Sequence, residues 1–190
     1  MARSDDIYVV PRDLPVPEDD GACDHLAGMR LPSLALPATS GRTVDLSREN
    51  ERHLVVYCYP RSGRPDEEPP AGWNAIPGAR GCTPQACAFR DHHRQLEAAN
   101  ARVYGLSTQS TAYQQELVER LHLPFEVLSD AELHFAGALG LPTFQVQSMT
   151  LIKRLTIIAF AGIIEKVFYP VFPPHSNPQE VLHWLSTHSR

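Results

Sequence analysis

The chain has 190 residues, 43% of them hydrophobic, and its 17 lysines and arginines against 22 aspartates and glutamates give a formal net charge of −5. This composition suits one soluble domain of ordinary size. Nucleic-acid binding depends on clustered basic residues, so a mildly acidic chain with no basic run argues against such a partner. The longest uncharged apolar run, residues 155–164, is about half as long as a membrane-spanning helix, so no membrane association is expected. The first residues show no hydrophobic secretory signal, and we therefore expect a cytoplasmic protein.

The sequence contains four cysteines, namely Cys23, Cys58, Cys82 and Cys87. Because cytoplasmic thiols are kept reduced, free, catalytic or metal-binding cysteines are favoured over a permanent disulfide framework. Cys58 lies in the middle of an apolar run and is expected to be buried. Cys23 lies in a polar segment and is expected to face solvent.

The first half of the chain alternates irregular and regular segments. Residues 1–28 are rich in proline and acidic residues, which predicts an extended N-terminal arm before a domain that spans residues 29–190. Residues 53–59 form a β-branched and aromatic run, typical of a strand buried on both faces. A proline-rich insert follows at about residues 63–77, and a loop of this length is usually functional or disordered. Residues 84–99 have apolar spacing that predicts a helix.

The middle of the chain continues this alternation. Residues 102–107 and 125–128 predict strands, and residues 110–121 between them predict a helix. Residues 129–132 read Ser-Asp-Ala-Glu, a capping box for a short helix that ends near Gly140.

The C-terminal part adds two strands and a helix. Residues 156–160 and 163–169 predict a hairpin around Ala161 and Gly162. A last helix is expected to be capped by Asn177. Together these elements predict an α/β domain with a mostly parallel sheet and an antiparallel hairpin near its end.

Two cysteines lie where the long loop enters the helix. A thiolate at a helix start is stabilised by the positive end of the helix dipole and by free backbone N–H groups, so Cys82 is a candidate nucleophile. Cys87 follows five residues later. On a regular helix their Cα atoms would be roughly 8.6 Å apart, beyond the approximately 7 Å limit for a disulfide. These two cysteines can therefore form a disulfide only if the first helical turn unwinds.

From about residue 31 to its C-terminus the chain resembles the peroxiredoxins, specifically the bacterioferritin-comigratory or PrxQ branch. The segments that carry the resemblance are residues 41–47, 55–60, 81–91, 105–107 and 154–156. Cys82 and Cys87 match the peroxidatic and resolving cysteines at the five-residue spacing of that branch. Arg154 matches the arginine that flanks the peroxidatic sulfur.

The resemblance implies a thioredoxin-like fold with helices on both faces of the sheet. It also implies reduction of hydrogen peroxide or organic hydroperoxides, in which Cys82 becomes a sulfenic acid and Cys87 condenses with it to an intramolecular disulfide. Thioredoxin or a similar dithiol would then reduce this disulfide. No cofactor or metal is implied, and the chain would be a monomer or a weak homodimer.

The sequence departs from the family at the hydroxyl that normally precedes the cysteine. The family motif places a proline and a threonine or serine where this chain has Ala75 and Ala79. Pro60 still follows the first strand, and the insert separates it from the cysteine. Pro60, Ser62 and Thr83 are the residues expected to position the substrate, with Ser62 as the candidate replacement for the missing hydroxyl.

Two side chains near the cysteines carry weaker expectations. Arg80, two residues before Cys82, could stabilise its thiolate, although a surface position is favoured. Trp73 in the insert could contact a partner or cover the site, although packing within the loop is favoured.

One alternative is a zinc site. Cys82, Cys87, His92 and His93 are residue types that zinc uses. On one helix, however, positions five residues apart point in different directions, so a single ion could not be bound tetrahedrally without breaking the helix.

A second alternative is a thioredoxin-like redox sensor or binding module without efficient peroxidase turnover, in which the insert carries the interaction. Rapid peroxide consumption with thioredoxin, its reductase and NADPH would exclude this alternative.

Overall fold

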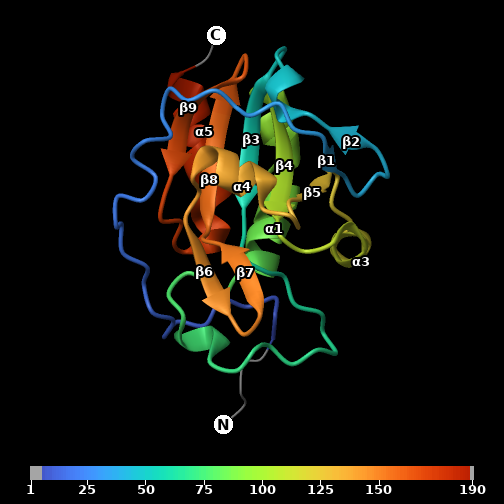
Figure 1. The fold of residues 1–190 in the computed structure, drawn as a ribbon, viewed down its shortest axis with the longest axis vertical. Helices are drawn as coiled ribbons and strands as arrows, with labels where there is room; N and C mark the ends of the chain where they lie inside the picture. Colours follow the sequence, from blue (N-terminus) through green and yellow to red (C-terminus); the bar gives the residue numbers. More distant parts are fainter. Residues whose placement is uncertain (1–5, 189–190) are drawn as a thin grey trace.

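The computed structural model describes residues 6–188, which fold around a five-stranded sheet (Figure 1). The strand order is β5-β4-β3-β8-β9. The strands are β3 (His53–Cys58), β4 (Ala101–Ser107), β5 (Val127–Ser129), β8 (Leu155–Phe160) and β9 (Ile163–Phe168). β3, β4 and β5 are parallel, β8 is antiparallel to β3, and β9 is antiparallel to β8. Four of the five strands therefore point the same way, and the C-terminal pair forms the predicted hairpin.

Helices cover both faces of the sheet because the strand residues alternate in direction. Val55 and Tyr57 face one core, while Val56 and Cys58 face the other. The first core is closed by α1 (Cys82–Asp91), α2 (His93–Ala98), α3 (Thr111–Leu121) and α5 (Asn177–Thr187). The second is closed by α4 (His134–Leu139) and part of the N-terminal segment. None of the helices within residues 6–188 is long and apolar enough to cross a membrane.

The structure adds two small hairpins that the sequence did not predict. They are formed by β1 (Leu36–Pro37) with β2 (Thr43–Val44), and by β6 (Thr143–Val146) with β7 (Met149–Ile152). Their strands are short and largely exposed on one side, so they lack the apolar run that marks β3. The β6–β7 hairpin projects from the end of the sheet that also carries the start of α1 (Figure 1).

The helix expected at residues 84–99 is two helices. α1 begins two residues earlier, at Cys82, and the chain bends at His92, where α2 follows. The His92 ring nitrogen Nδ1 lies 2.8 Å from the Ala88 carbonyl oxygen at this bend. The expectation of one continuous helix was therefore wrong, whereas the expected helix start beside Cys82 is confirmed.

The capping box predicted at residues 129–132 does not form, and α4 is capped differently. The Asp130 carboxylate accepts hydrogen bonds from the Phe135 and Ala136 backbone N–H groups, both at 2.9 Å. Leu133 takes a left-handed conformation with φ of 57°, which delays the helix start to residue 134. Asp130 therefore caps α4 from further back along the chain than the sequence pattern suggested.

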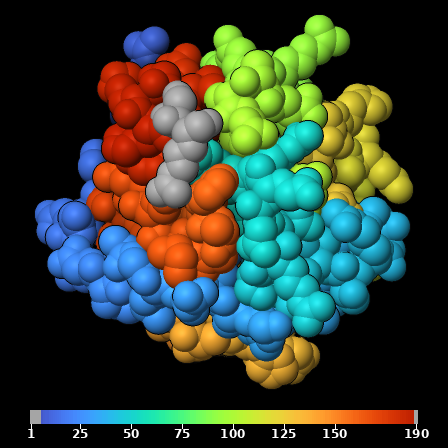
Figure 2. All heavy atoms as spheres, turned by 90° about the horizontal axis from the view of Figure 1, so that it is seen from above, coloured from blue at the N-terminus to red at the C-terminus, as the bar shows by residue number. Residues whose placement is uncertain are grey.

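The N-terminal segment packs closely on the domain. Leu26 is fully buried and Cys23 is only 8% exposed, so the expectation of a solvent-facing Cys23 was wrong. The backbone of Gly28 and Leu31 bonds to the turn end of the β8–β9 hairpin, at Ile164 and Gly162. Figure 2 shows this segment, in blue, along the edge of the molecule beside the orange C-terminal strands.

Candidate active site

The start of α1 is shaped by a glycine. Gly81 has a left-handed φ of 105°, which L side chains rarely adopt. A Cβ atom at this position would lie 2.4 Å from Pro174 Cγ, in the segment that leads into α5. Glycine is therefore required both for the backbone turn and for the close approach of Pro174, and together these set the position of Cys82 as the first residue of the helix.

The Cys82 sulfur contacts the guanidinium of Arg154. Arg154 Nη2 donates to Cys82 Sγ at 3.1 Å, and the two residues are 3% and 4% exposed. Arg154 directly precedes β8, the strand beside β3 in the centre of the sheet. A buried cation at this distance stabilises the thiolate form of a cysteine. The structure thus brings together two residues that the sequence separates by 72 positions.

Arg154 is held from several sides. Its nitrogens donate to the backbone carbonyls of Gly78, Ala79 and Arg80 at 3.1–3.3 Å. Nη1 donates to Gln85 Oε1, at the end of the first turn of α1. These contacts leave the guanidinium little freedom to rotate, which fixes its orientation toward the sulfur.

A buried polar chain continues from Gln85 and was missed in the sequence. Gln85 Nε2 donates to Asn177 Oδ1 at 3.2 Å, and Thr156 Oγ1 donates to the same oxygen at 2.6 Å. All three residues are fully buried. Asn177 is the first residue of α5, not its cap as expected, because its side chain is turned inward. The only sequence signal was a glutamine on the same helix as Cys82.

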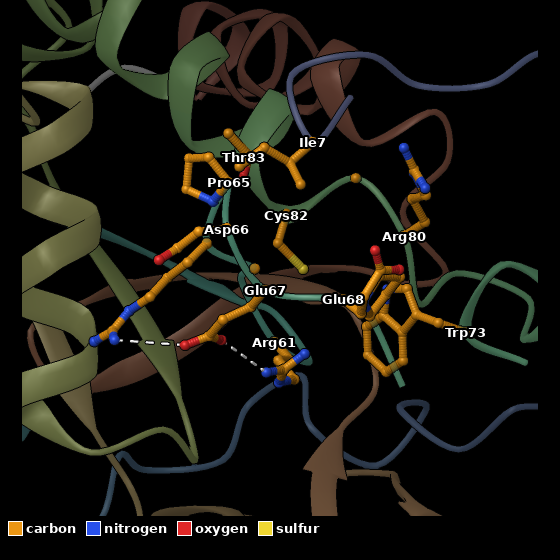
Figure 3. A pocket seen from close by; sticks show the side chains of 14 residues that line it. Ile7, Arg61, Pro65, Asp66, Glu67, Glu68, Trp73, Arg80, Cys82 and Thr83 are labelled. Atoms are coloured by element: carbon orange, nitrogen blue, oxygen red, sulfur yellow. Dashed lines mark hydrogen bonds and ion pairs between the residues drawn. The ribbon is translucent and has the colours of Figure 1, made fainter. Parts of the chain in front are cut away.

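Cys82 opens into a cavity of about 170 Å³ (Figure 3). Cys82 and Thr83 form its inner end, the insert forms much of its wall through residues 63–69 and Trp73, and Ile7 lies over it from the N-terminal segment. In the close-up these side chains surround the sulfur from different sides. The insert and the N-terminal segment are therefore parts of the site wall.

The insert is anchored to α3 through Glu67. Tyr113, on α3, donates its hydroxyl to Glu67 Oε2 at 2.7 Å. Arg61 and Arg64 each place a guanidinium nitrogen 3.5 Å from the same carboxylate, and Arg64 lies 4.3 Å from the centre of the Tyr113 ring. Burial, together with the hydrogen bond to Glu67, raises the pKa of Tyr113 to about 12, so the tyrosine remains a donor.

Arg80 and Trp73 are both buried in this wall. Arg80 is 8% exposed and donates to Asn74 Oδ1 at 3.0 Å and to the Asp6 carbonyl at 2.9 Å, so the favoured surface position was wrong. Trp73 packs on the β6–β7 hairpin, with its ring centroid 6.3 Å from that of Phe144, and also lines the cavity. Trp73 therefore packs against neighbouring side chains and also covers part of the site.

The three residues expected to position a substrate are separated. Ser62 donates its backbone N–H and its hydroxyl to Gln109 Oε1, at 2.9 and 3.1 Å, and neither Ser62 nor Pro60 lines the cavity. Thr83 does line it, with only 2% of its surface exposed. Ala79 offers only its carbonyl group, which Arg154 occupies. Of the expected hydroxyls, the structure brings only that of Thr83 to the site.

The remaining cysteines lie in different environments. Cys87 is half-buried on α1 and free, and burial raises its pKa above the ordinary value. Burial also raises the pKa of Cys58, and it raises that of Cys23 to about 12, so neither is a ready nucleophile. Within residues 6–188 no group of three or more histidine, cysteine or acidic side chains is arranged to hold a metal ion. The zinc alternative therefore finds no support in the described part of the chain.

Comparison with known sequences identifies a family model and several related proteins that match most of this chain. The Redoxin family model matches residues 26–182. A chloroplastic peroxiredoxin Q of Oryza sativa subsp. japonica is 32% identical over 161 residues, which cover 84% of this chain and 66% of the rice protein. Peroxiredoxin Bcp of Escherichia coli strain K12 is 30% identical over 167 residues, which cover 86% of this chain and 97% of that protein. The chain thus spans slightly less than two thirds of the rice protein and nearly all of the bacterial one.

Solved structures show the same fold. Peroxidoxin BcpB of Mycobacterium tuberculosis matches with a TM-score of 0.70 and 22% identity, over 85% of this chain and 96% of that one. A cysteine-to-serine variant of Xylella fastidiosa PrxQ matches with a TM-score of 0.71 and 21% identity, over 86% and 97%. The bacterioferritin comigratory protein of Xanthomonas campestris, studied for alkyl peroxide reduction, has a TM-score of 0.66 and 18% identity, over 94% and 100%.

Proposed function

Because the chain belongs to the redoxin family, among the Bcp and Q peroxiredoxins, we propose that it is a thiol-dependent peroxidase whose nucleophile is Cys82. The observation that carries this proposal is the 3.1 Å contact between Arg154 Nη2 and Cys82 Sγ at the start of α1, beside a cavity. An arginine held against a buried sulfur favours the thiolate, which is the reactive form of cysteine.

In the first step the Cys82 thiolate attacks the terminal oxygen of a hydroperoxide. The sulfur–oxygen bond forms, the oxygen–oxygen bond breaks, and the alkoxide or hydroxide that leaves takes up a proton to give an alcohol or water. The thiolate becomes a sulfenic acid. Arg154 and the free N–H groups of the first helical turn stabilise the negative charge on the reacting oxygens. The study of alkyl peroxide reduction by the Xanthomonas protein supports including organic hydroperoxides among the substrates.

Thr83 is the residue we assign to hydrogen-bond the peroxide. Its side chain lines the cavity directly after Cys82, and it forms no hydrogen bond through its hydroxyl with another side chain described in residues 6–188. Ser62 is engaged with Gln109, which makes it a weaker candidate for this role. Pro60, two residues after the end of β3, is buried and does not line the cavity, so it would act only by shaping the loop.

In the second step Cys87 attacks the sulfenic acid, a disulfide forms and water leaves. Both cysteines lie on the ten-residue helix α1, and residues five apart on a helix are roughly 8.6 Å apart at Cα, too far for a disulfide. The first turn of α1 must therefore unwind. Thioredoxin or a similar dithiol would reduce the disulfide by exchange, and the cytoplasm, where thiols stay reduced, suits this cycle.

The proposal is tested with wild type, Cys82→Ser and Cys87→Ser, each oxidised with hydrogen peroxide and analysed by mass. We expect an intramolecular disulfide in wild type, a sulfenic or higher acid on Cys82 in Cys87→Ser, and neither product in Cys82→Ser. Unchanged masses in all three proteins would refute the proposal. A disulfide that forms without sustained peroxide consumption by thioredoxin, its reductase and NADPH would instead favour the redox sensor.

A further inference from the structure

Two arginines tie the N-terminal segment to the insert on either side of Ile7. Arg80 donates to the Asp6 carbonyl at 2.9 Å and to Asn74 of the insert at 3.0 Å. Arg120, on α3, donates to the Tyr8 hydroxyl and to the Gly63 carbonyl of the insert, both at 3.1 Å. The residues that precede and follow Ile7 are thus both bridged to the insert, which fixes Ile7 over the cavity.

Ile7 also packs directly on the insert. A Cβ atom built on Gly63 would lie 3.7 Å from Ile7 Cγ2, an ordinary van der Waals distance. Ile7 lies outside the part of the chain, residues 26–182, that the family model matches, whereas the insert lies inside it. The contribution of Ile7 to the outer wall of the cavity is therefore not part of the matched family region.

The cavity is large enough for a molecule bigger than hydrogen peroxide, and part of its lining is apolar. Its volume is about 170 Å³, and an apolar cavity of about 150 Å³ is large enough to bind benzene. Apolar surface comes from Ile7, Pro65, Pro69 and Trp73, around the thiol end at Cys82. The charged lining residues are three arginines and three carboxylates, so the wall offers no net charge to an ionic group.

We propose that Ile7, from the N-terminal segment, sets the size limit of this cavity for the organic substituent of a neutral hydroperoxide, at about the size of a phenyl group. This inference rests on the proposed peroxidase function. In the bound complex the substituent packs between Ile7 and Trp73 while the terminal peroxide oxygen meets the Cys82 sulfur. After attack, the alcohol that carries the substituent leaves through the same cavity.

The test compares hydrogen peroxide, tert-butyl hydroperoxide and cumene hydroperoxide as substrates for wild type, Ile7→Trp and Ile7→Ala, with dithiothreitol as reductant. The readout is the ratio of kcat/KM for cumene hydroperoxide to that for hydrogen peroxide. We expect Ile7→Trp to lower this ratio about tenfold or more by filling the cavity, and Ile7→Ala to raise it about threefold. Val9→Trp is the matched control, because Val9 is on the same segment, 46% exposed and outside the cavity, and it should leave the ratio within about twofold.

The two proposals fail in different ways. If wild type consumes none of the three hydroperoxides, the peroxidase proposal and this inference both fail. If all are consumed and the ratio is unchanged in both Ile7 variants, the peroxidase stands and the inference is overturned. Should Ile7→Trp not fold, Ile7→Ala still decides, because its expected shift has the opposite sign from any loss caused by a damaged site.

Discussion

Replacing Arg154 with glutamine should slow the reaction of Cys82 with peroxide about 10- to 150-fold. The guanidinium lies 3.1 Å from the sulfur, and both residues are almost fully buried. A hydrogen bond to a charged group contributes ~1.5–3 kcal/mol, and each ~1.36 kcal/mol changes a rate about tenfold. Glutamine keeps a hydrogen-bond donor but removes the positive charge. The substitution therefore removes electrostatic stabilisation from the Cys82 thiolate and from the transition state of its attack on the peroxide.

The rate is measured in a single turnover of the reduced protein by stopped-flow tryptophan fluorescence, since Trp73 lines the cavity of Cys82. Lys153→Gln is the control, because it removes the same charge one residue earlier, where the ammonium group pairs with Asp20 at 2.8 Å. This control should react within about twofold of wild type. A folded Arg154→Gln protein that reacts within about threefold of wild type would refute the reasoning.

Three further predictions concern the glycine before Cys82, the buried Asn177 and the pH dependence of disulfide formation. Gly81→Ala should lower the free energy of unfolding by ~2 kcal/mol or more, measured by urea denaturation, because of the left-handed backbone and the contact with Pro174. Asn177→Ala should cost ~1–3 kcal/mol in the same assay, since it removes the acceptor of the buried Thr156 hydroxyl. Disulfide formation should speed up about tenfold per pH unit between about pH 6 and 8 in stopped-flow experiments, because burial raises the pKa of Cys87 and its thiolate fraction therefore still grows through this range. A rate of disulfide formation that is flat with pH would contradict this last expectation.

The elements predicted correctly are those whose signal is local. The strand β3 was visible because both of its faces are buried and every residue in it is apolar or aromatic apart from His53. The β8–β9 turn was visible because Gly162 lies between two apolar runs, and glycine readily adopts the positive φ that the short connection requires. Ala161 also adopts a positive φ, of 48°, which its residue type did not predict. The helix start near Cys82 followed from the apolar spacing after residue 84 and from the loop that precedes it, although the structure places the start two residues earlier.

The contacts that were missed join segments far apart in the chain. Gln85 meets Asn177 across 92 residues, and no periodicity within either helix marks that pair. Ser62 was a candidate because it follows Pro60 just before the insert and could fold back toward Cys82. Its hydroxyl instead donates to Gln109, 47 residues further along the chain. The place of Ile7 over the cavity depends on bridges from Arg80 and Arg120, whose partners no sequence pattern reveals.

The short helix α1 carries both cysteines within ten residues. In the proposed cycle, the rate of recycling therefore depends on temperature through the stability of this helix. Each turnover demands that one turn melt and then re-form, so the local stability of that turn acts as a rate parameter distinct from the stability of the whole fold. Substitutions that stiffen the helix start would raise the melting temperature and slow recycling at low temperature. In the proposed cycle, the temperature dependence of recycling would accordingly reflect the stability of this single helical turn.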